Sequence, residues 1–160
     1  MSEEELKKIA SEFLSKNYNI ELNVPVLRNN RLRTTLGRFV ISSDKKTPLR
    51  IEIAGNTLDY GTDKAIIGVL KHECIHYALH LKGESSTDGH PYFESELKKH
   101  DAPSTRSTRI GKNYVFTCNA CGKENETRIK QLNRTPYRYR TTCCNAKLTI
   151  IGERIYDGTN

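Results

Sequence analysis

Apolar residues recur at helical spacing in two stretches of the chain. Near the start, Ser2 and Glu5 form a capping box, and apolar residues follow at positions 6, 9, 10, 13 and 14. This pattern predicts a first amphipathic helix. A second, longer helix is predicted to begin at Thr62 or Asp63 and to end at Gly83, because hydroxyl or carboxylate side chains cap helix starts and glycine closes helix ends.

Between these helices the pattern changes to that of extended segments. We expect strands over residues 24–28, 31–35, 38–42 and 49–54. In the last segment Leu49, Ile51 and Ile53 alternate with charged residues, as in a half-buried antiparallel strand. Gly37 marks a turn or bulge between the second and third segments.

The rest of the chain predicts a second, smaller domain. A short helix is expected to open at Pro91 and to end before Pro103. Residues 104–111 are polar, contain glycine, and are predicted to be a linker. Beyond them lie short β-prone stretches around four cysteines. We therefore predict an α+β protein with one domain over residues 1–103 and another over residues 112–160.

Charge separates the same two regions. Residues 1–103 carry 15 Lys and Arg against 15 Asp and Glu, whereas residues 104–160 carry 11 against 4 and hold the whole net charge of +7. A basic segment beside a neutral one favours a nucleic-acid partner for the tail over a merely solvated surface. Mean hydropathy is −0.67 and the N-terminal residues are acidic. We therefore expect a cytoplasmic protein that does not enter a membrane.

The long helix carries the candidate chemistry in the stretch LKHECIHYALH. His72 and His76 are one turn apart, so both imidazoles leave the same face and can share one metal ion. Glu73 lies beside them, placed to take a proton from water rather than to bind the ion. The alternative interpretation is a helix face that is rich in histidine and binds no metal.

A catalytic zinc takes three protein ligands, and the residues leave the third one open. His80 continues the same face, but lies about 12 Å along the helix axis from the first histidine. His90 follows a loop with two glycines that lets the chain fold back, so we favour it over Glu94 and Glu96 on the next helix. Cys74 points to the opposite side of the helix and is predicted to be a small buried residue.

The tail RIKQLNRTPYRYR combines cations with aromatic side chains. Guanidinium groups bind phosphates, and tyrosine rings offer faces on which unpaired bases stack. The tyrosines could instead fill a small core, with the basic residues on its surface. The candidate nucleic-acid contacts are Arg128, Lys130, Arg134, Tyr137, Arg138, Tyr139 and Arg140.

Several stretches together resemble the SprT-like family, the bacterial branch of the group that includes the Spartan DNA–protein crosslink proteases. They are NNRLRTTLGRF, LKHECIHYALH, DGHPYF, CNAC and CCNAKL, in this order. The resemblance implies a catalytic zinc bound by His72, His76 and His90, with Glu73 as the base. It also implies a zincin-like metalloprotease domain, with a small, mainly antiparallel sheet packed on helices, followed by a zinc-ribbon-like basic domain.

The chain departs from the family pattern at the second cysteine pair. Cys118 and Cys121 form a regular C-x-x-C knuckle, but the second knuckle reads TTCCNAKL. When CNAKL is aligned with the family pattern, Cys144 takes the position of the last ligand. Thr141 then occupies the position where the family has the partner cysteine. Cys143 could substitute, although neighbouring side chains of an extended chain point to opposite sides. A structural zinc and a ribbon without a complete zinc site both remain open.

These observations predict a zinc-dependent endopeptidase that acts on DNA-associated proteins, including DNA–protein crosslinks. We expect one catalytic Zn²⁺ and a second, structural ion if the ribbon binds one. The expected partners are single-stranded or junction DNA and proteins bound to it, in the nucleoid. The alternative is a nucleic-acid-binding zinc protein with little or no peptidase activity.

Overall fold

The chain folds into two compact units in the structure, a computed structural model that describes residues 1–104 and 107–159. The first unit contains the residues up to Ile110 together with those from Asp157 on, and the second contains Gly111–Tyr156. Part of the predicted linker, residues 105 and 106, lies outside the described residues. None of the helices in the described ranges is long and apolar enough to cross a membrane.

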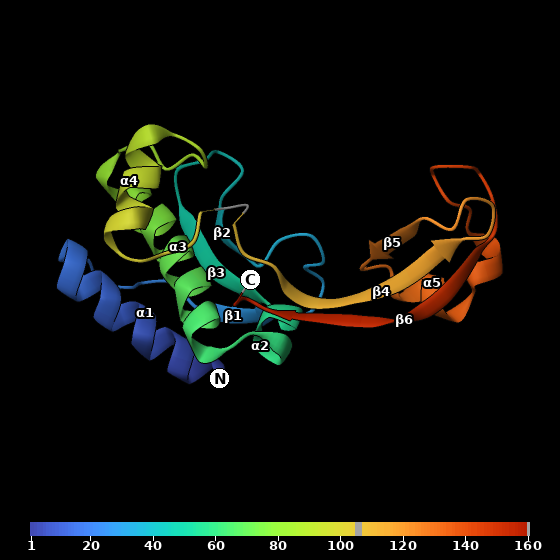
Figure 1. The fold of residues 1–160 in the computed structure, drawn as a ribbon. Coiled ribbons are helices and arrows are strands. Elements are labelled where there is room, and N and C mark those ends of the chain that lie inside the picture. Colours follow the sequence, from blue (N-terminus) through green and yellow to red (C-terminus); the bar gives the residue numbers. More distant parts are fainter. Residues whose placement is uncertain (105–106, 160) are drawn as a thin grey trace. The chain divides into compact units, whose positions relative to one another are not determined.

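The first unit is a three-stranded sheet with helices packed on it (Figure 1). Strand β3 is central, paired in parallel with β1 and antiparallel with β2. The sheet is therefore mixed rather than mainly antiparallel as predicted. The elements are α1 (Glu3–Tyr18), β1 (Val26–Asn29), β2 (Gly37–Ile41), β3 (Pro48–Ala54), α2 (Gly55–Tyr60), α3 (Asp63–Lys82) and α4 (Pro91–Lys99).

Capping contacts confirm the predicted start of α1 and the predicted start and end of α3. At α1 the Glu5 amide donates to the Ser2 hydroxyl at 3.2 Å, and the Ser2 amide donates to the Glu5 carboxylate at 2.6 Å. At α3 the Thr62 hydroxyl accepts from the Ala65 amide at 3.2 Å. Gly83 closes α3 in the left-handed conformation with φ of 70°. The long helix thus begins and ends where the sequence indicates.

One predicted strand is absent, and one short helix was not predicted. Residues 31–35 form a turn and loop instead of a strand, and most of their side chains are exposed. The loop is held at its end, where the Leu36 carbonyl accepts from the Ala54 amide and from the Thr57 hydroxyl, both at 2.9 Å. These two donors flank the start of α2, a short helix that the sequence did not indicate.

Strand β3 separates the apolar core from a charged outer face. Ile51 and Ile53 are fully buried against α1 and α3. On the other face Glu52 is also buried, and it accepts from Arg38 and Arg50 at 2.6 Å each and from Asn29 at 2.7 Å. Burial opposes ionisation of Glu52, but these hydrogen bonds outweigh it and lower its pKa to about 2.

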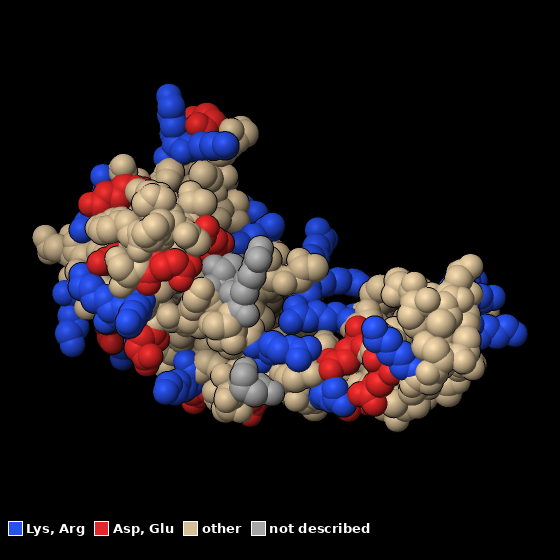
Figure 2. Space-filling model, turned by 45° about the horizontal axis from the view of Figure 1, so that its top comes forward, with Lys and Arg blue, Asp and Glu red and all other residues tan. Residues whose placement is uncertain are grey.

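The second unit is a smaller three-stranded sheet in the order β5-β4-β6. It comprises β4 (Ile110–Cys118), β5 (Glu124–Thr127), α5 (Lys130–Arg134), the 3₁₀ turn η1 (Pro136–Arg138) and β6 (Leu148–Asp157). Glu126 connects the three strands, because it accepts from Asn113 on β4 and from Arg154 and Tyr156 on β6. Figure 2 shows acidic side chains of this unit gathered beside basic ones.

Replacing Glu52 with Gln should destabilise the protein, because two guanidinium groups lose their shared carboxylate. We expect the free energy of unfolding to decrease by about 1–3 kcal/mol at neutral pH. Since the pKa of Glu52 is lowered on folding, its contribution is present above the ordinary carboxyl pKa of 4.5 and is lost as pH falls toward about 2. Urea unfolding of the unmodified protein and of Glu52→Gln between pH 7 and pH 3 measures the difference in their free energies of unfolding. We expect this difference to decrease as the pH falls.

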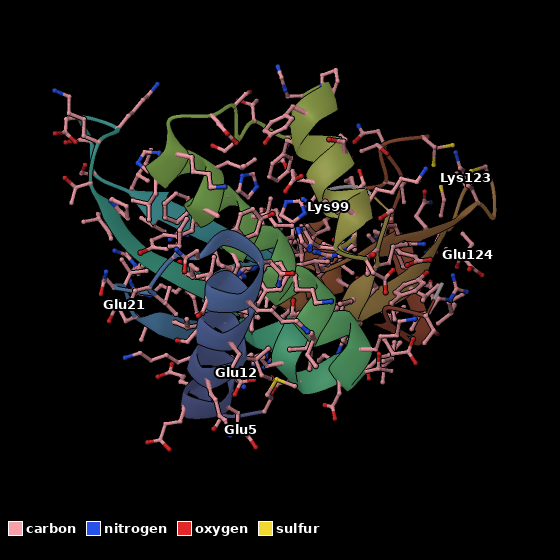
Figure 3. The ribbon with its side chains drawn as sticks, turned by 90° about the vertical axis from the view of Figure 1, so that its left-hand side faces the viewer. Glu5, Glu12, Glu21, Lys99, Lys123 and Glu124 are labelled. Atoms are coloured by element: carbon pink, nitrogen blue, oxygen red, sulfur yellow. The ribbon has the colours of Figure 1, made fainter. Side chains whose placement is uncertain are left out.

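The control is Glu12→Gln on the outer face of α1 (Figure 3), where an exposed carboxylate should change stability by less than about 0.5 kcal/mol. Equal stability of Glu52→Gln and the unmodified protein at pH 7 would contradict the structural role assigned to Glu52.

Candidate metal centres

The two histidines of the long helix face each other on α3. The Nε2 atoms of His72 and His76 lie 3.1 Å apart, and the rings meet edge to face with centroids 4.8 Å apart. Their side chains are only 8% and 15% exposed. The one-turn spacing read from the sequence therefore brings both imidazoles to one point, as predicted.

Backbone carbonyls fix the orientation of both rings. His72 Nδ1 lies 2.8 Å from the carbonyl oxygen of Pro103, and His76 Nδ1 lies 2.7 Å from that of Ser86. A carbonyl oxygen can only accept, so each Nδ1 carries the hydrogen. In the neutral rings each Nε2 then presents a lone pair to the other. Such outer contacts are the usual means by which proteins orient metal-binding histidines.

Asp88 completes a triangle of donor atoms. Its Oδ1 lies 3.2 Å from His72 Nε2 and 3.5 Å from His76 Nε2. In a tetrahedral site with zinc–ligand bonds of about 2.0–2.1 Å, neighbouring ligand atoms are roughly 3.3 Å apart. The three observed separations match this value, and two imidazoles with one carboxylate are ordinary zinc donors. These residues fit a zinc ion.

His90 is placed differently from our expectation. It lies at the N-cap of α4, is exposed, and its Nδ1 accepts from the Tyr92 amide at 3.3 Å. The chain turns at Gly89, where φ is 79°, so that Asp88 rather than His90 reaches the histidine pair. The signal that could have found Asp88 is its place in the same glycine-containing loop, because a carboxylate is an ordinary zinc ligand.

The other candidates for a third ligand have different partners. The Glu94 carboxylate accepts from the Gly89 amide at 3.1 Å. Glu96 is buried and accepts from the Tyr18 hydroxyl at 2.8 Å. His80 Nε2 lies 3.0 Å from the carbonyl oxygen of Lys46. Each of the three therefore has a structural contact away from the histidine pair.

Glu73 lies beneath strand β2. Its side chain is buried, and its carboxylate accepts a hydrogen bond from the Phe39 amide. Burial, followed by the nearby charge of Asp88, raises the pKa of Glu73 to about 8. A dication held by the histidine pair would oppose this shift, because positive charge favours the ionised carboxylate.

Gly37 makes this close packing possible. A Cβ atom at this position would lie 3.1 Å from the Glu73 side chain and 3.1 Å from the carbonyl oxygen of Glu52. The sequence pattern indicates only a turn or bulge at Gly37. In the structure it also allows β2 to pass directly over the carboxylate.

Phe93 of α4 supports the histidine pair from the other side. Its ring stacks on His76 with centroids 4.2 Å apart and 23° between planes, and meets the edge of His72 at 5.3 Å. Phe93 is fully buried. This contact was not predicted, because an apolar residue on an amphipathic helix is ordinarily assigned to the core.

Four cysteines form a second group of candidate ligands. The sulfur atoms of Cys118, Cys121, Cys143 and Cys144 all lie within 4.8 Å of one another. Cys121 Sγ and Cys143 Sγ are 3.7 Å apart. A tetrahedral zinc with bonds of about 2.3 Å to sulfur requires roughly 3.8 Å between neighbouring sulfurs. The second unit therefore also contains a donor set that fits a metal ion.

A tight turn explains how adjacent cysteines reach one point. The Asn145 amide donates to the Thr141 carbonyl at 2.9 Å, as the Gly122 amide donates to the Cys118 carbonyl at 2.8 Å in the first knuckle. Asn145 and Gly122 both have positive φ, 50° and 72°. Because this segment is a turn and not an extended strand, the two neighbouring thiols do not point to opposite sides.

Thr141 occupies the position that corresponds to Cys118 in this pair of turns. Its hydroxyl lies 3.2 Å from Cys118 Sγ. The hydrogen bond from Thr141 is the main cause that lowers the pKa of Cys118, to about 6, which favours the thiolate form that binds metals. Cys118 is buried, whereas the other three cysteines are exposed.

The basic stretch of residues 128–140 contains the helix α5 and the 3₁₀ turn η1. Tyr137 and Arg138 lie in the 3₁₀ turn, with Tyr137 68% exposed and the Arg138 guanidinium 5.9 Å from its ring centre. Arg140 donates to the carbonyls of Tyr137 and Tyr139 and so holds this turn. Of the remaining predicted contacts, Lys130 and Arg134 are exposed on α5, and Arg128 precedes this helix.

Comparison with known proteins places the chain in a family. The model of the SprT-like family matches residues 3–109. A curated protein from Bacillus velezensis, named Protein SprT-like, is 30% identical over 94% of this chain and 99% of its own length. Namesakes from Bacillus subtilis and Staphylococcus epidermidis are 29% identical over 94% of the chain and 36% identical over 79%, covering 99% and 80% of their own lengths. No solved structure matches at a comparable level of significance. The chain therefore belongs to the SprT-like family.

Proposed function

We propose that the protein is a zinc-dependent endopeptidase that acts on DNA-associated proteins, including DNA–protein crosslinks. Membership of the SprT-like family supports a metalloprotease-type function. The observation that carries the proposal is the convergence of two imidazole lone pairs with a buried carboxylate that is not one of the three grouped donors. A purely structural metal site would not need such a carboxylate.

His72, His76 and Asp88 would hold the ion in the arrangement observed here. When bound, Zn²⁺ acts as a Lewis acid that polarises a peptide carbonyl and increases the acidity of water. The carbonyls of Pro103 and Ser86 hold both imidazoles with Nε2 free to bind. Three protein donors leave one tetrahedral position open, as in zinc sites that carry out catalysis.

Glu73 would move the proton. Its ionised carboxylate takes a proton from the attacking water and then gives that proton to the leaving amine. The Phe39 amide orients the carboxylate, and Gly37 leaves room for it beneath β2. The buried position excludes bulk water, so the proton is exchanged only within the site.

The second unit would bind DNA. Its three acidic residues form ion pairs within the unit, Glu153 with Lys112 and both Glu124 and Glu126 with Arg154. Residues 130–140, which form α5 and the following turn, contain four basic and no acidic residues. The exposed Tyr137 ring offers a stacking face, which favours single strands and junctions over intact duplex.

Replacing Glu73 with Gln should abolish peptide cleavage and keep the metal. The amide can still accept from the Phe39 backbone but cannot take a proton, so kcat/KM should fall at least about a hundredfold. Metal content and cleavage of an unstructured peptide measure the two effects. Glu12→Gln is the control and should retain full activity.

Loss of zinc in Glu73→Gln would overturn the division between base and ligands. Absence of cleavage by the unmodified zinc-loaded protein, on DNA as well as in solution, would instead support a nucleic-acid-binding protein without peptidase activity.

The cysteine group should hold a second zinc ion per chain. Metal analysis of protein purified without chelator should give about two equivalents, and Cys121→Ser should reduce this to about one, because three donors hold zinc much more weakly than four. The matched control is Cys74→Ala, which removes a buried cysteine outside the group. One equivalent in both the unmodified and the Cys121→Ser protein would show a ribbon without metal.

Removing three cations from the second unit should weaken DNA binding. The variant is the full chain with Lys130→Gln, Arg134→Gln and Arg138→Gln. For single-stranded DNA, we expect the slope of log binding constant against log salt concentration to become shallower by about 0.7 for each phosphate contact that is lost. Fluorescence anisotropy over a range of salt concentrations measures the slope. The control makes the same change in net charge on α1 at the exposed residues Lys7, Lys8 and Lys16. Equal weakening by the two triple variants would contradict the assignment.

A further inference from the structure

The cysteine group lies largely at the surface of the second unit. Cys118 is buried, whereas Cys121, Cys143 and Cys144 are exposed. Thr141 occupies the buried position beside Cys118, so a hydroxyl and not a fourth sulfur lies there, 3.2 Å from Cys118 Sγ. Three of the four cysteines are therefore accessible to small oxidants, which attack exposed thiolates in preference to buried ones.

Cys121 and Cys143 are the pair best placed to form a disulfide. Their sulfur atoms lie 3.7 Å apart, and each cysteine belongs to a different turn of the group. A bond between Cys143 and Cys144 is disfavoured, because neighbouring Cα atoms are about 3.8 Å apart and disulfides ordinarily span about 4.4–6.8 Å. A bond from Cys118 is disfavoured because its sulfur is buried and would lose the contact with Thr141.

A disulfide between these cysteines would link the same two turns as a metal ion. The segment between them contains β5, α5 and η1, and with them all of the proposed DNA contacts. Two hydrogen bonds that involve no sulfur also connect the two sides of the group. The Asn119 amide donates to the Lys147 carbonyl at 3.0 Å, and the Thr149 hydroxyl donates to the Asn119 side chain at 2.8 Å. The segment would therefore stay anchored at both ends without a metal.

We propose that Cys121 and Cys143 are a redox modification site, at which a hydroperoxide forms a reversible disulfide and displaces zinc from the cysteine group. The release of zinc rests on the proposed metal site of this group and concerns its regulation, whereas the disulfide itself does not depend on the metal.

The reaction has two steps. One thiolate attacks the O–O bond of the peroxide and becomes a sulfenic acid, and an alcohol or water leaves after taking a proton from solvent. The second thiolate then attacks this sulfur and displaces hydroxide, which is protonated to water, as the S–S bond forms. The two sulfur atoms together lose the two electrons that the peroxide gains. Because two of its four donors are lost, a zinc ion is released without a change in its charge.

Disulfide mapping of the full chain tests this site. Protein purified without chelator is treated with hydrogen peroxide, digested without reduction and analysed by mass spectrometry, while a chromogenic chelator measures the zinc released. Cys143→Ser and Cys144→Ser form a matched pair, because each removes one exposed sulfur and leaves three in the group. Cys74→Ala is the control, because it removes a buried cysteine outside the group.

We expect one disulfide, between Cys121 and Cys143, with release of about one zinc equivalent for each disulfide formed. Cys144→Ser and Cys74→Ala should form the same disulfide. Cys143→Ser should form intramolecular disulfides at least about tenfold more slowly, because its remaining sulfurs are buried or lack a partner in the opposite turn that peroxide can reach. A thiol reductant with added zinc should restore the original metal content.

Three results would overturn the proposal. They are a disulfide that involves Cys118 or joins adjacent cysteines, equal oxidation of Cys143→Ser and Cys144→Ser, and complete oxidation of a protein with two zinc equivalents that releases no metal. The zinc content before oxidation and the cleavage of peptides test the proposed function separately. If the protein carries only one equivalent beforehand, the proposed metal site of the cysteine group fails, and the mapped disulfide still decides whether the redox site exists.

Discussion

Two imidazole lone pairs facing each other at 3.1 Å are the constraint on which the site depends. Since both Nδ1 atoms donate to backbone carbonyls, neither ring can relieve this contact by changing its tautomer without losing a hydrogen bond. A proton or a cation between the rings removes the repulsion. With a carboxylate at 3.2 Å and 3.5 Å from the two nitrogens, the arrangement has the charge and spacing that a dication requires.

The fold surrounds this pair with contacts from four separate segments. Helix α3 sets the one-turn spacing, and the loop after it supplies the carbonyl of Ser86 and the carboxylate of Asp88. The segment after α4 supplies the carbonyl of Pro103, and α4 itself supplies the stacked ring of Phe93. Rigid support of this kind keeps metal ligands within the narrow geometry that binding needs. The site is therefore a product of the whole first unit.

Helix capping preferences and helical spacing were sufficient to predict the parts of the site that a single helix determines. The capping contacts of Thr62 and Gly83 and the shared face of His72 and His76 depend on residues close in sequence, and the structure has them as predicted.

Spacing and helix geometry do not determine features that depend on a backbone turn or on a distant segment. The left-handed conformation of Gly89 decides that Asp88 rather than His90 reaches the histidine pair, and a spacing pattern does not contain that angle. In the same way, the turn closed by Asn145 brings two adjacent cysteines together, which an extended chain would separate. The packing of Gly37 on Glu73 joins residues far apart in the chain and was not visible before the fold.

We propose that the histidine pair on α3 is a metal site and that it lies beside the carboxylate of Glu73. The most direct test is a crystal structure of protein purified without chelator, with diffraction data collected on both sides of the zinc absorption edge. We expect an anomalous peak between the Nε2 atoms of His72 and His76. A peak only at the cysteine group, with the two imidazoles still facing each other and no ion between them, would contradict it.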